Sequence, residues 1–126
     1  MEQNSFYESY EDYLKTIYLI SKTHRGGWVS NSEISRFLKV KPSSVTSMLY
    51  NLRESELIDW KPRGSVRLTS KGKRVAQHTL RNYQILNDFF FHFLKLKNKE
   101  LVQNISCKIE HHLPEEVSAA LQGLLS

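Results

Sequence analysis

Apolar residues recur three and four positions apart through most of this chain, which is the spacing of amphipathic helices. The first such stretch predicts a helix from about Ser9 to Lys22, with Ser9 as its N-cap and Asp12 three residues on. A second helix is predicted to begin near Ser30, where Ser30 and Glu33 have the spacing of a capping box, and to end around Lys39. The segment between these two helices is rich in glycine and predicts a turn.

A third helix is predicted to open at Pro42, a residue suited to the first helical position. Its first turn presents small, uncharged hydroxyl side chains, where an ordinary surface helix would carry Glu and Lys. These are Ser43, Ser44, Thr46 and Ser47. Two segments of alternating apolar and polar residues then flank the turn Pro62-Arg63-Gly64, and this pattern predicts a β-hairpin.

The rest of the chain predicts helices only. A long helix is expected from about Ser70 to Phe93, capped by Thr69. Two shorter helices are expected at about 99–112 and 115–124. The residues expected to face inward on the long helix are Val75, Tyr83, Leu86, Phe90 and Phe93. The fold class is therefore mainly α: a winged helix-turn-helix domain at 1–74, followed by a short all-helical domain at 75–126.

Composition narrows the classes of protein that the chain can belong to. Hydrophobic residues make up 40% and charged residues 25%, which is ordinary for a globular protein. No apolar run approaches the roughly 20 residues that span a membrane. The polar N-terminus does not resemble a signal peptide. A single cysteine excludes an internal disulfide and fits a reducing compartment, so we expect a cytoplasmic protein with no membrane partner.

Positive charge is concentrated in the middle of the chain. The segment from Arg36 to Arg81 holds eleven Lys and Arg against three acids, whereas the net charge of the whole chain is +5. A basic middle on a winged helix-turn-helix predicts binding of double-stranded DNA, steeply dependent on salt. The residues expected to contact DNA are Lys41, Pro42, Ser43, Ser44, Thr46, Ser47, Arg63, Arg67 and Lys71. A protein-interaction module with the same fold is the alternative.

A second set of candidate residues lies in the helix predicted at 99–112. Cys107, Glu110 and His111 share one face at about 100° per residue, and a thiolate, a carboxylate and an imidazole can together bind a divalent transition metal. An exposed helix end with a packed thiol is the alternative interpretation. Three ligands leave a first-row ion short of donors, and Asp12 is a candidate for the fourth, although an Asp there is also typical of a helix cap.

An enzyme is not expected. The chain has no glycine-rich phosphate loop, and Cys107 and His111, one turn apart on a helix, have poor geometry for a nucleophile and its base.

Four segments in order resemble the diphtheria-toxin-repressor and manganese-transport-regulator family of metal-dependent repressors. They are residues 10–18 (YEDYLKTIY), 41–46 (KPSSVT), 68–73 (LTSKGK) and 109–113 (IEHHL). The resemblance implies a homodimer that binds palindromic operators when loaded with Fe(II) or Mn(II), and that represses metal-uptake genes. The positions that match the family's principal metal site are Asp12, Cys107, Glu110 and His111.

The chain departs from the family pattern at several positions. Cys107 matches the iron-responsive branch, whereas Asp12 matches the manganese branch. Tyr83 stands where a second metal site usually has a His, and Lys15 stands where the manganese branch has a Glu, so we expect one metal per protomer. The long helix also carries about two extra residues near Phe91 and His92. The rival hypothesis is a metal-independent winged-helix regulator in which Cys107 is structural or senses redox state.

Overall fold

The structure is a computed structural model that describes residues 2–61 and 64–126, with side chains from residue 8 onward. Arg63, one of the residues expected to contact DNA, lies outside the described residues. The chain divides into two compact units, Met1–Gln77 and His78–Ser126, and one long helix, α4 (Ser70–Asp88), continues from the first into the second. Each unit is described by itself below.

The first unit is built on α1 (Glu2–Ser21), which begins before the predicted start at Ser9, so Ser9 is inside the helix and does not cap it. Residues Tyr13, Leu14 and Ile17 of α1 join the core of this unit, as the apolar spacing predicted. The other buried members of that core are Val29, Ile34, Val45, Leu49, Leu52, Leu57, Ile58, Val66, Leu68 and Ala76.

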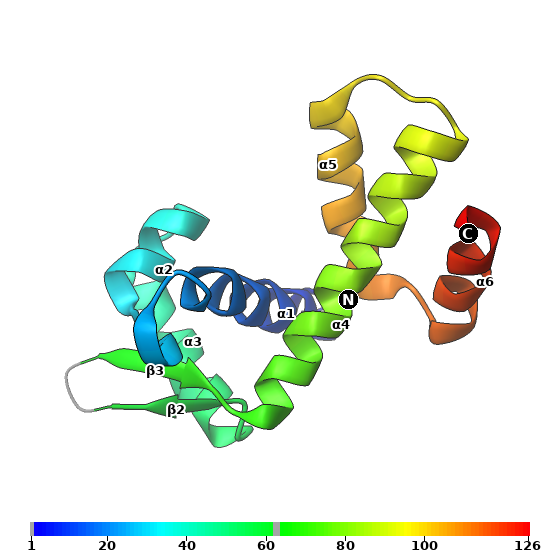
Figure 1. Ribbon diagram of the computed structural model, residues 1–126. Coiled ribbons are helices and arrows are strands. Elements are labelled where there is room, and N and C mark those ends of the chain that lie inside the picture. Colours follow the sequence, from blue (N-terminus) through cyan, green and yellow to red (C-terminus); the bar gives the residue numbers. More distant parts are fainter. Residues whose placement is uncertain (1, 62–63) are drawn as a thin grey trace. The chain divides into compact units, whose positions relative to one another are not determined.

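The helix-turn-helix consists of α2 (Asn31–Leu38) and α3 (Pro42–Glu54) (Figure 1). The predicted capping box is confirmed: the Ser30 hydroxyl accepts a hydrogen bond from the Glu33 backbone N–H, and the Glu33 carboxylate accepts one from the Ser30 N–H. Lys39 ends α2 in the left-handed conformation, with φ at 57°. Pro42 takes the first helical position of α3, as predicted.

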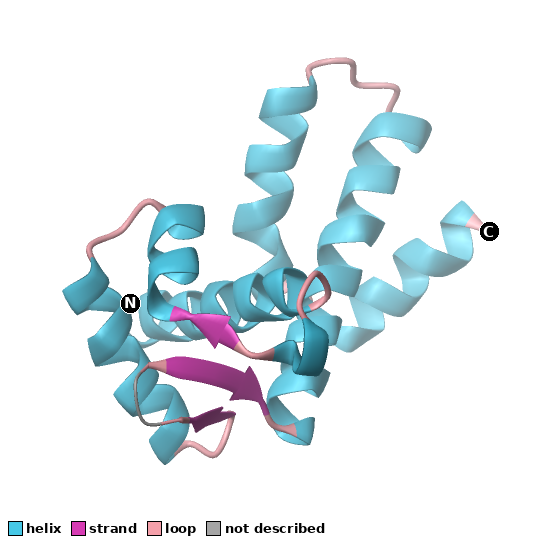
Figure 2. Ribbon diagram, turned by 60° about the vertical axis from the view of Figure 1, so that its left-hand side comes forward, coloured by secondary structure: helices cyan, strands magenta, loops and turns pink. Residues whose placement is uncertain are grey.

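The wing is a hairpin of β2 (Ile58–Trp60) and β3 (Ser65–Leu68), as expected. A third strand, β1 (Val29–Ser30), pairs antiparallel with β3, so the strand order is β1-β3-β2 (Figure 2). The alternation of the sequence did not predict β1, because two residues are too few to show a period. A short 3-10 turn, η1 (Arg25–Gly27), leads into β1.

In the second unit, α5 (Lys99–Ile109) runs back beside the C-terminal half of α4, and a 3-10 turn, η3 (Glu110–His112), continues it (Figures 1 and 2). The last helix is α6 (Glu115–Leu125). The long predicted helix ends in a π-helical turn, η2 (Phe89–Phe93), at the place where extra residues were expected. A π turn changes the angular spacing of side chains, and Phe93 is 51% exposed, so its predicted inward position is wrong.

The backbone at the start of α4 closely approaches the backbone of Glu56 and Leu57, just after α3. The Thr69 hydroxyl accepts a hydrogen bond from the Gly72 N–H at 3.1 Å and donates one to the Glu56 carbonyl at 2.8 Å, which confirms Thr69 as the cap. A Cβ atom on Gly72 would lie 2.1 Å from the Leu57 carbonyl oxygen. Only glycine therefore fits at this position.

We predict that Gly72→Ala destabilises the protein by about 2 kcal/mol or more, because the backbone of Leu57 or of α4 must move. Gly123→Ala is the matched control. A Cβ there meets nothing within 4 Å, so the substitution should be neutral or stabilise α6 by up to about 1 kcal/mol. Urea unfolding followed by circular dichroism measures both. Equal effects of the two substitutions would contradict the close approach.

The cap of α2 also carries a titratable pair, because the His24 ring hydrogen-bonds to the Glu33 carboxylate. The bond to Glu33 raises the pKa of His24 above its ordinary value. The bond from the Ser30 backbone N–H, followed by the bond from His24, lowers the pKa of Glu33. The stabilising effect of protonated His24 is therefore lost as pH rises through its raised pKa, and that of ionised Glu33 is lost as pH falls through its lowered pKa.

We predict that Glu33→Gln brings the pKa of His24 back toward its ordinary value of about 6.5, as followed by NMR titration of the ring. Glu54→Gln, on the exposed end of α3, should leave the His24 titration where it is in the wild type. An unchanged His24 pKa in Glu33→Gln would show that the pair does not form in solution.

Candidate nucleic-acid interface and metal-ligating residues

The first turn of α3 presents an uncharged, hydroxyl-rich surface to solvent. Four of the residues predicted to contact DNA, Pro42, Ser43, Ser44 and Ser47, are exposed there, and Lys41 is exposed at the N-cap. The opposite side of the helix holds Val45, Leu49 and Leu52 in the core, so the helix is fixed while this face stays open. Short side chains of this kind permit close approach to a groove floor and to phosphates.

Thr46 differs from its neighbours because its hydroxyl is already engaged. Its Oγ1 donates to the Pro42 carbonyl at 3.1 Å and accepts a hydrogen bond from Asn31 Nδ2 at 2.9 Å. A hydroxyl has only one hydrogen, so Thr46 cannot donate to a base edge while it keeps this bond. The side chain therefore ties the start of α2 to the first turn of α3. Its pairing with Asn31, 15 residues away, had no signal in the sequence.

The wing carries cations that stack on one aromatic ring. The Lys61 ammonium lies 4.3 Å from the centroid of the Trp28 ring, and the Arg67 guanidinium lies 4.6 Å from it. Arg67 is exposed, as a contact with DNA requires. Lys71, also exposed, donates to the Ser55 carbonyl at 3.1 Å, which holds its charge near the end of α3. Sequence reasoning missed Trp28, which follows the turn η1 and holds these cations from outside the hairpin.

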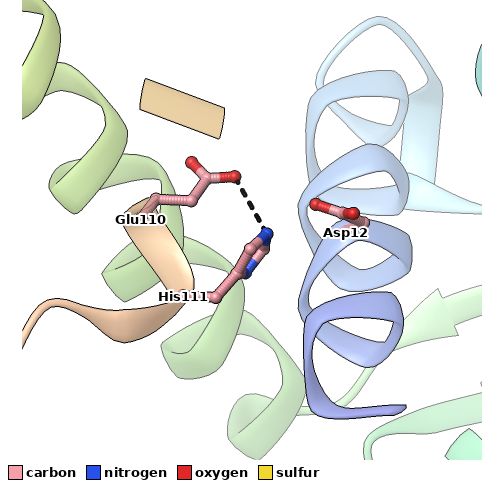
Figure 3. A group of neighbouring side chains, drawn as sticks. All are labelled: Asp12, Glu110 and His111. Carbon is pink, nitrogen blue, oxygen red and sulfur yellow. Dashed lines mark ion pairs between the residues drawn. The ribbon is translucent and has the colours of Figure 1, made fainter. Parts of the chain in front are cut away.

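In the second unit, a carboxylate and an imidazole lie side by side in the buried turn η3. His111 Nε2 is 3.6 Å from Glu110 Oε1, and both side chains are almost fully buried, at 4% and 0% exposure (Figure 3). Burial of a carboxylate costs several kcal/mol unless hydrogen bonds or opposite charges offset it. The surroundings of such a pair must therefore offset this cost.

The other two predicted metal ligands have different surroundings. Cys107 is on α5 and its thiol is exposed, although spacing placed it on the same face as Glu110 and His111. Within the described residues, the structure does not gather the ligand atoms of these three side chains into one cluster. Asp12, also drawn in Figure 3, is half-buried on α1 in the first unit.

A buried polar network holds the backbone of Glu110. Asn82 on α4 donates through Nδ2 to the Glu110 carbonyl at 3.3 Å, and its Oδ1 accepts a bond of 2.6 Å from the Ser118 hydroxyl on α6. Asn82 is 2% exposed and Ser118 is fully buried. One amide side chain on α4 therefore joins the turn η3 and the helix α6. The sequence pattern missed both residues, because a polar residue within an apolar stripe usually marks the stripe's edge.

The donor chemistry of the buried pair fits a divalent transition metal. Carboxylate oxygen and imidazole nitrogen are the ligands that Fe(II), Mn(II) and Zn(II) take in proteins, and a thiolate would shift preference toward the softer ions. The hydrogen bond from Asn82 holds the main chain of Glu110, in the manner of the outer partners that orient metal ligands.

Large apolar side chains are exposed on the second unit, in the turn η2, in the following loop and on α5. They are Phe93, Leu94, Leu96, Leu101 and Ile105. Exposed apolar side chains are typical of protein–protein interfaces where they form a contiguous patch. In the described part of the chain no helix is both long and apolar enough to cross a membrane.

A winged helix-turn-helix with a hydroxyl-rich recognition helix and a cationic wing is typical of DNA-binding regulators. Residues 5–66 match the iron dependent repressor N-terminal DNA-binding domain, and residues 69–126 match the iron dependent repressor metal binding and dimerisation domain. The chain therefore belongs to the iron-dependent repressor family, which consists of metal-dependent transcriptional regulators and not of enzymes. The mainly α fold and the resemblance noted in the sequence are both confirmed.

Individual relatives agree with this assignment. An HTH-type transcriptional regulator of Methanocaldococcus jannaschii is 32% identical over 91% of this chain and 90% of its own length. The regulator MntR of Geobacillus thermodenitrificans is 34% identical, over 83% of this chain and 72% of its own. The crystal structure of T. acidophilum IdeR superposes with a TM-score of 0.74 at 30% identity, over 90% of this chain. The chain covers only 52% of that IdeR chain.

We predict that Ser118→Ala destabilises the second unit by about 1–3 kcal/mol, because it leaves the buried Asn82 Oδ1 without its 2.6 Å hydrogen bond. Ser126→Ala is the control. The Ser126 hydroxyl donates to the backbone carbonyls of Gln122 and Gly123 in exposed hydrogen bonds, so its loss should have little effect. Thermal unfolding measures both variants. A Ser118→Ala variant as stable as the wild type would mean that the network adds nothing to the fold.

Proposed function

We propose that this protein is a metal-dependent repressor of genes for uptake of iron or manganese, and that it acts as a homodimer on palindromic operators. The observation that carries the proposal is the buried carboxylate–imidazole pair Glu110–His111 in the unit that matches a metal binding and dimerisation domain. The open hydroxyl face of α3 in the other unit supplies the surface for DNA.

In this proposal Asp12, Cys107, Glu110 and His111 together hold one divalent ion per protomer. Glu110 and His111 are already adjacent, whereas Cys107 must turn its exposed thiol inward and Asp12 must come from the other unit. A thiolate favours Fe(II) over Mn(II), whereas the carboxylates suit either ion. Tyr83 and Lys15, which stand where the resemblance to the family implies further ligands, argue against a second ion.

The function of the ion would be to join the two units. Asp12 belongs to Met1–Gln77, and the other three ligands belong to His78–Ser126. Residues that share one ion lose freedom relative to one another, so the bound form fixes the first unit, and with it α3, against the dimerisation unit. Two recognition helices must be about 34 Å apart, or a multiple of that, to enter successive major grooves. If the loaded form has the correct spacing, metal and operator must strengthen each other's binding by the same factor.

DNA recognition would rest on few strong base contacts. Pro42, Ser43, Ser44 and Ser47 would face the groove floor, and Arg67 and Lys71 would contact phosphates. Arg63, which lies outside the described residues, remains a predicted DNA contact. Lys41 would also belong to this surface. Thr46 would contribute by joining α2 to α3 through its hydrogen bond with Asn31. No Arg, Asn or Gln stands in this first turn, so thymine methyl contacts and DNA shape would contribute much of the specificity.

Dimerisation would use the exposed apolar side chains of the second unit. Leu94, Leu96, Leu101 and Ile105 lose unfavourable contact with water if a second copy covers them.

We predict that Asp12→Asn lowers metal-stimulated binding to a selected operator by about tenfold or more, because the neutral amide lacks the negative charge with which the carboxylate attracts a divalent ion. Operators are first selected from random DNA with Fe(II) or Mn(II) under reducing, anaerobic conditions. Fluorescence anisotropy with and without metal then gives the stimulation.

Glu54→Gln also removes one carboxylate from the first unit, but from the exposed end of α3, and should keep the full stimulation. If Asp12→Asn kept it as well, the proposed link between the units would be wrong.

A further inference from the structure

A cavity of about 390 Å³ opens in the first unit between the end of α1, the turn η1, strand β3 and the first turns of α4. This volume falls within the range of small-ligand sites in proteins. Both glycines of η1, Gly26 and Gly27, line it in the left-handed conformation, with φ at 77° and 74°. None of the hydroxyl residues of the α3 face belongs to its lining.

Three cationic side chains line this cavity, Lys22 from α1, Arg67 from β3 and Lys73 from α4. Among the described residues that line it, none is an Asp or a Glu. Gathering like charges around one hollow costs free energy through repulsion, and an anion inside the hollow would offset that cost.

Two of these cations are held by aromatic rings. The Lys22 ammonium lies 4.5 Å from the centroid of the Tyr18 ring, and the Arg67 guanidinium lies 4.6 Å from that of Trp28. A cation on an aromatic face is attracted and oriented but keeps its full charge, whereas a carboxylate partner would neutralise it. The rings therefore fix the positions of the cations and leave their positive potential available to a ligand.

The polar wall of the cavity is also ordered. Gln77 Nε2 donates to the Tyr18 hydroxyl at 3.3 Å, so the phenol keeps its own hydrogen for donation. This bond, together with the charges of Lys22 and Lys73, lowers the pKa of Tyr18 from its ordinary value, as expected where the potential is positive. An anion in the cavity would meet three cations and one phenolic donor.

We propose that this cavity is a binding site for a phosphate group, distinct from the metal site and from the recognition face of α3. Phosphate oxygens suit several converging cationic donors, with arginine as the preferred partner. The phosphate has two possible sources: a free phosphorylated small molecule, or the backbone of bound DNA beyond the bases that α3 contacts. Arg67 is the one residue that this site shares with the proposed DNA surface.

The test compares Lys73→Gln with Arg74→Gln in the full chain. The two residues are adjacent and exposed, and each substitution removes one positive charge, but only Lys73 lines the cavity. Inorganic phosphate and pyrophosphate are titrated by calorimetry without DNA. A free ligand predicts saturable binding that Lys73→Gln weakens by about tenfold or more and Arg74→Gln leaves unchanged.

The second arm measures DNA affinity against salt concentration for the same variants. If the phosphate comes from DNA, Lys73→Gln lowers the slope of log affinity against log salt by about 0.9, whereas Arg74→Gln keeps the wild-type slope. The proposal is overturned if phosphate and pyrophosphate do not bind and the slope is unchanged, or if both variants change either measurement equally.

Discussion

The buried contact between Glu110 and His111 is the interaction on which the proposed metal site depends. Two polar, ionisable side chains with almost no access to water are expensive, and the fold surrounds them with a specific arrangement. The chain leaves α-helical geometry at Glu110, and the Asn82 amide holds the Glu110 carbonyl while Ser118 holds that amide.

The first unit shows a different use of polar groups. Its recognition helix is fixed on one side by the core and on the other by the bond from Asn31 to Thr46, so the exposed serines are presented on a rigid support. Its cations are held against Trp28 and Tyr18, and this arrangement keeps their charge available to anions. Preorganised groups of this kind reduce the entropy lost on binding. In the proposed function the first unit contacts DNA and contributes Asp12 to the metal site, whereas the second unit contributes the other three ligands.

Much of the fold could be predicted from local sequence. Signals that act within a few residues could be recognised in the sequence. They are the Ser30–Glu33 capping box, Pro42 at the start of α3, Thr69 before α4 and the alternation around Pro62–Gly64. The strand β1 and the exposure of Phe93 could not be read in this way, since the first depends on pairing with β3 and the second on a π turn.

In the candidate site, too, local spacing predicted some contacts, whereas contacts between distant residues could not be predicted. Spacing alone indicated Glu110 and His111, which are neighbours, but it placed Cys107 with them although its thiol is exposed. Asn82 and Ser118 are 36 residues apart, and Trp28, at the end of the turn η1, contacts Arg67 of β3. Contacts of this range follow from tertiary packing, which no local period encodes. The resemblance to a family supplied Asp12 as a matching metal-site position.

The central claim is that one ion joins α1 to the turn η3, and hydrogen–deuterium exchange under anaerobic conditions tests it without knowledge of the operator. Fe(II) or Mn(II) should slow amide exchange in two separate segments, residues 8–18 of α1 and residues 106–112. Protection confined to 106–112, with α1 exchanging as in the metal-free protein, would contradict the claim.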